Sequence, residues 1–197
     1  MKILAFADTH GNKKDLKKLE KKSKDADILV CVGDLTWFGK DLEKLLRRLA
    51  KIGKIVLMIQ GNHEEGENLQ KKCSKFKNIR YVHRKSFRMG NKVFFAYGGG
   101  GFSTTDKRFE TCYKAFKKKL KKGDEVILIT HGPPYKTKLD KLYGGEYVGN
   151  KSYNKAIKSL NPILYICGHI HDTFKKKEVI GKTLVINPGP DGEILKI

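Results

Sequence analysis

The stretch YICGHIHDT, Tyr165 to Thr173, ends an apolar run with two histidines separated by one residue. The run itself, Ile163–Cys167, has the length and composition of a buried strand. Because alternate residues of an extended chain share a face, His169 and His171 are predicted to point together, with Cα atoms roughly 7 Å apart. Such a pair fits either two polar residues at a strand exit or a metal site.

Four other predicted strands end in the same way. In open α/β sheets the carboxyl ends of the strands border a crevice where sites form. We therefore expect the polar residues that follow these strands to meet at one edge of the molecule. The apolar runs are Ile3–Ala7, Ile28–Val32, Ile55–Ile59 and Val126–Ile129, and the residues that follow them are Asp8 and His10, then Asp34, then Asn62 and His63, then His131.

Helical patterns alternate with the early strands, which predicts a layered α/β domain over residues 1–197. Leu42, Leu45, Leu46 and Leu49 follow helical spacing, and Asn12 is placed to cap an earlier helix. A further helix is expected around Phe109–Leu120, and further strands at Val93–Ala96 and Leu184–Ile186. The last segment, Phe174–Ile197, resembles an antiparallel ribbon that closes the sheet, and Gly132–Gly149 is expected to be a long functional loop.

The distribution of histidine favours a metal site over isolated polar residues. The chain has 6 histidines. All but His83 follow predicted strands, and we interpret His83, in the segment YVHR, as an ordinary surface residue. A cluster of histidine, aspartate and asparagine at strand ends is the expected composition of a metal or catalytic site.

The donor types indicate two divalent ions rather than a structural zinc. Imidazole nitrogens, carboxylates and an amide oxygen, without thiolate, suit manganese, iron, cobalt, nickel or zinc. Seven donor residues are too many for one four-coordinate ion, whereas a bridging Asp34 would give each of two ions four bonds. Paired ions of this kind activate a bridging water and stabilise displacement at phosphorus.

The series D-x-H, G-D, G-N-H-[ED], a later histidine and G-H-x-H occurs complete and in order between residues 8 and 171. It resembles the calcineurin-like metallophosphoesterase superfamily. The segments GDLTWFG, THGPP, GHIH and INPG further resemble its small Icc-related phosphoesterases. The resemblance implies two mixed β-sheets packed as a sandwich and flanked by helices, in four layers, with the site at the strand ends.

The resemblance also implies a role for each residue of the series. His63 would be the acid that protonates the leaving oxygen after attack by a hydroxide bridging the ions, with Asp34 and Asn62 also in the catalytic set. One ion would be held by Asp8, His10, Asp34 and His171, and the other by Asp34, Asn62, His131 and His169.

Composition bears on partners and location. The chain carries 42 basic and 21 acidic residues, a net charge of +21. This charge fits either an acidic partner such as nucleic acid or a solvated lysine-rich surface. The 4 cysteines are scattered, and no apolar run reaches the length of a membrane span. We expect a cytoplasmic protein without a membrane partner.

Three functions remain open at this point. The first is a phosphoesterase acting on small molecules, with phosphodiesters preferred over monoesters. The second is a nuclease that uses the basic surface, and the third is a non-catalytic metal-binding scaffold. Trp37, Phe38 and Tyr135 are candidates for substrate contact, although Trp37 is equally compatible with core packing. Oligomeric state is not predicted.

Overall fold

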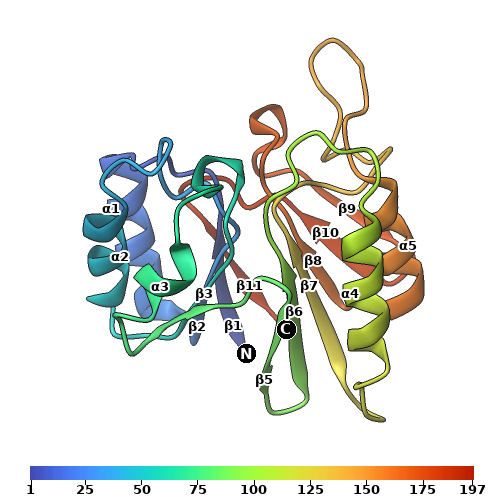
Figure 1. Ribbon diagram of the computed structural model, residues 1–197, viewed down its shortest axis with the longest axis horizontal. Coiled ribbons are helices and arrows are strands. Elements are labelled where there is room, and N and C mark those ends of the chain that lie inside the picture. The colour runs from blue at the N-terminus through green and yellow to red at the C-terminus, as the bar shows by residue number, and fades with distance from the viewer.

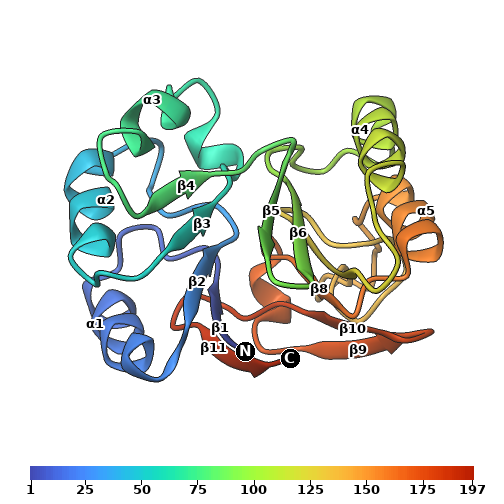
Figure 2. The same ribbon diagram turned by 90° about the horizontal axis from the view of Figure 1, so that it is seen from below.

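Two mixed β-sheets face each other in the computed structural model, which describes all residues from 1 to 197 (Figures 1 and 2). The first sheet has the strand order β11-β1-β2-β3-β4, with the bounds Glu193–Lys196, Lys2–Phe6, Ile28–Cys31, Val56–Met58 and Ile79–Tyr81. The second has the order β5-β6-β7-β8-β10-β9, with the bounds Lys85–Met89, Lys92–Tyr97, Glu125–Thr130, Leu164–Ile166, Thr183–Ile186 and Lys177–Ile180.

Helices cover the outer face of each sheet, so the molecule has four layers (Figure 1). The first sheet carries α1, α2 and α3, at Lys13–Lys22, Leu42–Ala50 and Leu69–Cys73. The second carries α4 and α5, at Lys107–Lys117 and Lys151–Leu160. This architecture confirms the predicted sandwich of two mixed sheets.

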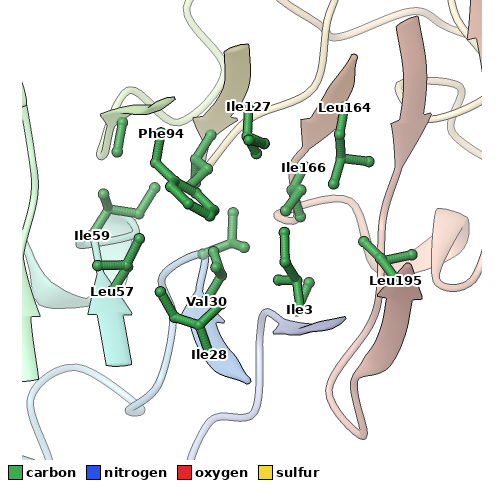
Figure 3. Close-up of a cluster of buried hydrophobic side chains, with 14 of the residues drawn as sticks. Ile3, Ile28, Val30, Leu57, Ile59, Phe94, Ile127, Leu164, Ile166 and Leu195 are labelled. Carbon is green, nitrogen blue, oxygen red and sulfur yellow. The ribbon is translucent and has the colours of Figure 1, made fainter. Parts of the chain in front are cut away.

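The central core lies between the two sheets, where aliphatic side chains of both inner faces meet (Figure 3). Ile3, Val30 and Leu57 from the first sheet face Phe94 and Ile166 from the second, and all five are at most 1% exposed. Burial of this apolar surface on both sides explains why the strands appear in the sequence as continuous apolar runs. The tight packing holds the two sheets in one relative position, which fixes the residues at their edges.

Two sequence predictions about helices are confirmed in detail. The side chain of Asn12 accepts hydrogen bonds from the backbone N–H groups of Lys14 and Asp15, so it caps α1 as expected. The four leucines of α2 are all buried against the first sheet. Asp41 precedes α2, but its side chain makes no capping hydrogen bond.

The C-terminal segment differs from the single ribbon that was expected. Strands β9 and β10 do pair as an antiparallel ribbon at the edge of the second sheet, but β11 leaves it and pairs antiparallel with β1 in the first sheet. The amino group of Met1 donates a hydrogen bond to the carbonyl of Ile197 at 2.7 Å. The sheet that β11 joins depends on packing across the core, and the local alternation of apolar and polar residues does not reveal that packing.

Strands β4 and β5 and helices α3 and α5 were not predicted. Three of them are short or partly exposed, so they lack a long apolar pattern. Helix α5 follows the loop at residues 132–149, which is irregular as predicted.

No helix in the structure combines the length and the apolar character needed to cross a membrane.

Candidate metal centre

The parallel strands of both sheets end at the upper edge of the molecule in Figure 1, and the predicted site residues follow those ends. Asp8, His10 and His171 form one group with donor atoms within 4.8 Å of one another. Asp34, His131 and His169 form a second such group. A third contains His10, Asp34 and His63 and so joins the first two.

Asn62 completes the cluster. Its Oδ1 lies 3.0 Å from Nε2 of His131, which itself lies 3.4 Å from Oδ2 of Asp34. The structure therefore brings together all eight side chains that the sequence analysis selected, although His10 and His171 stand 161 positions apart in the chain.

Unusual backbone conformations aim several of these side chains. Asp8, His10, Asp34 and His169 have positive φ angles of 57°, 44°, 50° and 71°. Such angles are uncommon outside glycine, cost of order 1–3 kcal/mol each, and concentrate at functional sites. A Cβ on Gly61 would lie 2.0 Å from Oδ1 of Asp34, so this position requires glycine for the close approach of the two loops.

Backbone carbonyls set the tautomers of two histidines. His10 Nδ1 lies 3.0 Å from the carbonyl of Thr36, and His131 Nδ1 lies 2.9 Å from the carbonyl of Val32. Because a carbonyl oxygen can only accept, both Nδ1 atoms carry the hydrogen and donate it. In the neutral rings Nε2 therefore presents its lone pair to the site, which is the arrangement that a metal ligand needs.

The charges of the second group are strongly coupled. Burial lowers the pKa of His131, but the hydrogen bond and charge of Asp34 overcome it and raise that pKa to about 9. Burial raises the pKa of Asp34, but the hydrogen bond and charge of His131 outweigh burial and lower this pKa to about 2. Positive charge is therefore favoured beside Asp34, whose Oδ2 lies 3.4 Å from Nε2 of His131, and both residues are candidate metal ligands.

Two other histidines are held neutral, as metal ligands must be. Burial, and then the charge of His131, lower the pKa of His169 to about 4. Burial, and then His10, also lower the pKa of His171. Burial also raises the pKa of Asp8 to about 7, although the charge of His131 and the backbone N–H of His169 act against it.

Unsatisfied polar atoms support the fit of these residues to metal ions. Oδ1 of Asp8 and Nε2 of His169 are buried and make no hydrogen bond. Nε2 of His10 and Nε2 of His171 lie 3.3 Å apart. Buried polar atoms rarely lack partners, and these are nitrogen and oxygen donors that borderline divalent ions prefer. The residues present therefore fit a metal centre.

Glu64 is a further important residue, which the sequence analysis did not select although it belongs to the Gly-Asn-His-Glu segment. Its buried carboxylate accepts hydrogen bonds from the backbone N–H groups of Gly61, Asp34 and Thr36 and from the hydroxyl of Thr36, at 2.7 to 3.0 Å. One carboxylate thus ties the loop that carries Asp34 to the loop that carries Asn62.

Glu64→Gln is expected to destabilise the folded protein by about 1–3 kcal/mol, because an amide NH₂ would face backbone donors in place of an acceptor oxygen. Denaturant unfolding of the metal-free protein measures this change. Glu65→Gln is the matched control, since Glu65 is exposed. Equal stability of the two variants would show that the Glu64 hydrogen bonds do not hold the loops together.

His83 is not the ordinary surface residue that was expected. It is half-buried, and its Nδ1 accepts a hydrogen bond from the N–H of Gly98 at 2.9 Å. Burial, followed by the charge of Arg84, lowers its pKa to about 4. Gly98, just after β6, reaches His83 only in the folded chain. The local sequence pattern therefore could not indicate that His83 is half-buried.

The aromatic candidates also occupy definite positions. Trp37 is 56% exposed and Phe38 is 67% exposed, so the core-packing interpretation of Trp37 is wrong. Both rings lie against His63, at centroid distances of 4.8 Å and 4.1 Å. Tyr135 instead packs near Tyr147, at 6.4 Å, within the long loop.

This chain is similar to known proteins over most of its length. The chain is 34% identical to an uncharacterized protein of Methanocaldococcus jannaschii over 96% of this chain and 88% of that protein. A crystal structure of the protein TT1561 of Thermus thermophilus has a TM-score of 0.76 at 20% identity, covering 95% of this chain and 88% of the other. The phosphopantetheinyl hydrolase of Mycobacterium tuberculosis has a TM-score of 0.70 at 12% identity, with 95% and 88% covered.

The two structural likenesses show the shared fold. The family evidence comes from the sequence: the profile described as calcineurin-like phosphoesterase matches residues 1–173, which include every residue of the candidate metal centre. The family match and the cluster of candidate metal ligands together support a metal-dependent hydrolase. The chain belongs to the calcineurin-like phosphoesterase family.

Proposed function

We propose that this protein is a dinuclear metal-dependent phosphoesterase that prefers phosphodiesters of small molecules. The observation that carries the proposal is the presence of two donor groups, Asp8 with His10 and His171 and Asp34 with His131 and His169, that a third group joins through His10 and Asp34. One ion would be held by Asp8, His10, Asp34 and His171, and the other by Asp34, Asn62, His131 and His169.

Two divalent ions, when bound, would supply Lewis-acid stabilisation of the phosphoryl oxygens and an activated water. The two carboxylates offset only half of the four positive charges of such a pair, so the centre would attract phosphate oxyanions. Nitrogen and oxygen donors without thiolate support manganese, iron, cobalt, nickel or zinc.

His63 would act on the leaving group. Its backbone N–H donates to Oδ1 of Asp34 at 3.0 Å, and its Nε2 lies 3.8 Å from Oδ2 of the same residue. The Asp34 carboxylate thus orients the ring beside the centre. Nδ1 of His63 is buried without a partner. An imidazole held in this way could pass a proton to the departing oxygen, while Asn62 and Asp34 position the reacting groups.

The surroundings of the centre support a phosphorus atom with two organic substituents. Trp37 and Phe38 border the side of His63, and Phe102, which is 64% exposed, lies 4.6 Å from the ring of His169. Apolar rings thus border both donor groups. A phosphodiester has two organic groups that could contact them, whereas a monoester has only one.

A metal and substrate panel tests this function. The stripped protein should be inactive and should regain activity with manganese or another divalent ion, with bis(4-nitrophenyl) phosphate hydrolysed faster than 4-nitrophenyl phosphate. Activity that survives full metal removal would contradict the metal-dependent function. A faster monoester reaction would contradict the diester preference alone.

Nucleic acid is the second candidate substrate, favoured by the net charge of +21. Exposed lysines occur on the outer helices of both sides, among them Lys14 and Lys18 in α1 and Lys114 and Lys117 in α4.

The salt dependence of binding separates the two roles of the lysines. If an oligonucleotide is the physiological substrate, raising salt from about 50 to about 200 mM should weaken its binding by orders of magnitude, because phosphate contacts release counterions. Turnover of a small diester should change far less. Equally shallow dependence for both ligands would assign the lysines to solvation.

A further inference from the structure

We propose that Trp37 and Phe38 form an aromatic platform that binds the leaving group of the substrate, so that the enzyme selects esters whose leaving group carries a nucleobase or a similar planar ring. This inference rests on the proposed function, specifically on His63 as the leaving-group acid. It concerns a feature that the metal centre itself does not require.

The position of the two rings carries the argument. Phe38 lies 4.1 Å and Trp37 4.8 Å from the ring of His63, and Trp37 also lies 5.2 Å from the ring of His10. A group that receives a proton from His63 must lie within hydrogen-bonding reach of it. The remainder of that group therefore extends over the rings that cover His63.

The exposure of these rings needs an explanation. Large aromatic side chains are normally covered, yet Trp37 and Phe38 are 56% and 67% exposed and pack side by side at 5.4 Å. Exposed aromatic rings beside a reactive centre are suited to stacking on a planar group, which contributes ~1–3 kcal/mol per base in nucleic-acid binding.

The backbone holds the platform in place. Phe38 has a φ of 47°, a strained conformation for a bulky residue, and this turn brings its ring onto His63. Thr36, directly before the platform, is fixed by Glu64, and its hydroxyl accepts a hydrogen bond from the N–H of Gly39 at 3.0 Å. The two aromatic residues thus lie in a short turn that is anchored at both ends.

The structure also offers space beside the indole of Trp37, on the side of His10 rather than of His63 or Phe38. A hollow of about 310 Å³ lies between Trp37, His10 and Leu45, with Lys40 and Asp41 at its border. This volume is at the lower end of the range of small-molecule sites. The polar border would supply hydrogen-bonding partners for a nucleobase, while the indole supplies the apolar face.

Kinetics with matched substrates test the platform. Adenosine 5′-monophosphate and ribose 5-phosphate share the same leaving alkoxide, the ribose 5′ oxygen, and differ in the base. Trp37→Ala should raise KM for the adenosine ester about 10-fold or more and leave the ribose ester nearly unchanged. Phe38→Leu, which keeps apolar area without a ring, should show a smaller loss in the same direction.

Two comparison variants separate the platform from general effects. Phe102→Ala removes an aromatic ring at the other donor group and should not reduce the preference for the base on the leaving group. Met89→Ala removes an exposed apolar side chain at the far end of β5 and should change neither substrate. A loss of base preference in Phe102→Ala equal to that in Trp37→Ala would overturn the assignment to the leaving group.

Fluorescence provides a test that does not depend on turnover. Trp37 is the only tryptophan in the chain, so the intrinsic indole signal reports directly on the platform. Adenosine 5′-monophosphate should quench this signal in the metal-loaded protein at concentrations where ribose 5-phosphate does not. Absence of quenching would overturn the platform even if phosphoesters are hydrolysed, whereas quenching without hydrolysis of any ester would contradict the proposed function alone.

Discussion

Asp34→Ala is expected to abolish the binding of both metal ions and to reduce phosphoester hydrolysis to background. Asp34 belongs to two of the three donor groups, one with His10 and His63 and one with His131 and His169. It is also the main negative charge beside buried His131. Without it each ion would lose a ligand, and the four positive charges would face one remaining carboxylate.

Asp8→Ala is the matched comparison, because Asp8 belongs only to the group with His10 and His171. This variant should keep close to one ion per chain under saturating metal, whereas Asp34→Ala should keep essentially none. Elemental analysis gives the stoichiometry, and circular dichroism checks that both variants fold. A wild-type protein with at most one ion at saturation would contradict the dinuclear proposal.

His63→Ala is expected to keep both ions and the fold and to lose about 10²–10⁴-fold in rate on esters with an alkoxide leaving group, the usual contribution of a general acid. A nitrophenolate departs without a proton, so nitrophenyl esters should be much less impaired. His63 lies near Asp34 in the structure, yet its Nε2 is 3.8 Å from the nearer carboxylate oxygen. That separation is compatible with a proton donor beside the centre.

His169→Ala provides the contrast to His63→Ala. Nε2 of His169 is buried without a partner and His169 belongs to the second donor group, so its loss should lower metal affinity and the rates on all esters together. The measurement is metal content with rates on alkyl and nitrophenyl diesters for both variants. If His63→Ala sheds metal, His63 is a ligand, and if it affects both leaving groups equally, it is not the leaving-group acid.

Much of the fold was predictable because its main strands are buried on both faces. Burial makes Ile28–Cys31 and Leu164–Ile166 continuous apolar runs, which local composition reveals directly. Strand β5 has mostly exposed side chains and an irregular pattern, so it was missed. The partner of β11 was also beyond local reasoning, because antiparallel pairing with β1 depends on which sheet edge remains free.

The sequence by itself determined the chemistry of the candidate site: the residue types, their positions after parallel strands, and hence their meeting at one edge. Only the tertiary structure decided how the donors divide into groups, that Glu64 joins two loops, and that Trp37 lies exposed against His63. The physical reason is the distance along the chain over which each signal acts. Strand periodicity and residue type act over a few neighbouring positions, whereas the contact of His10 with His171 depends on two sheets packing through a shared core.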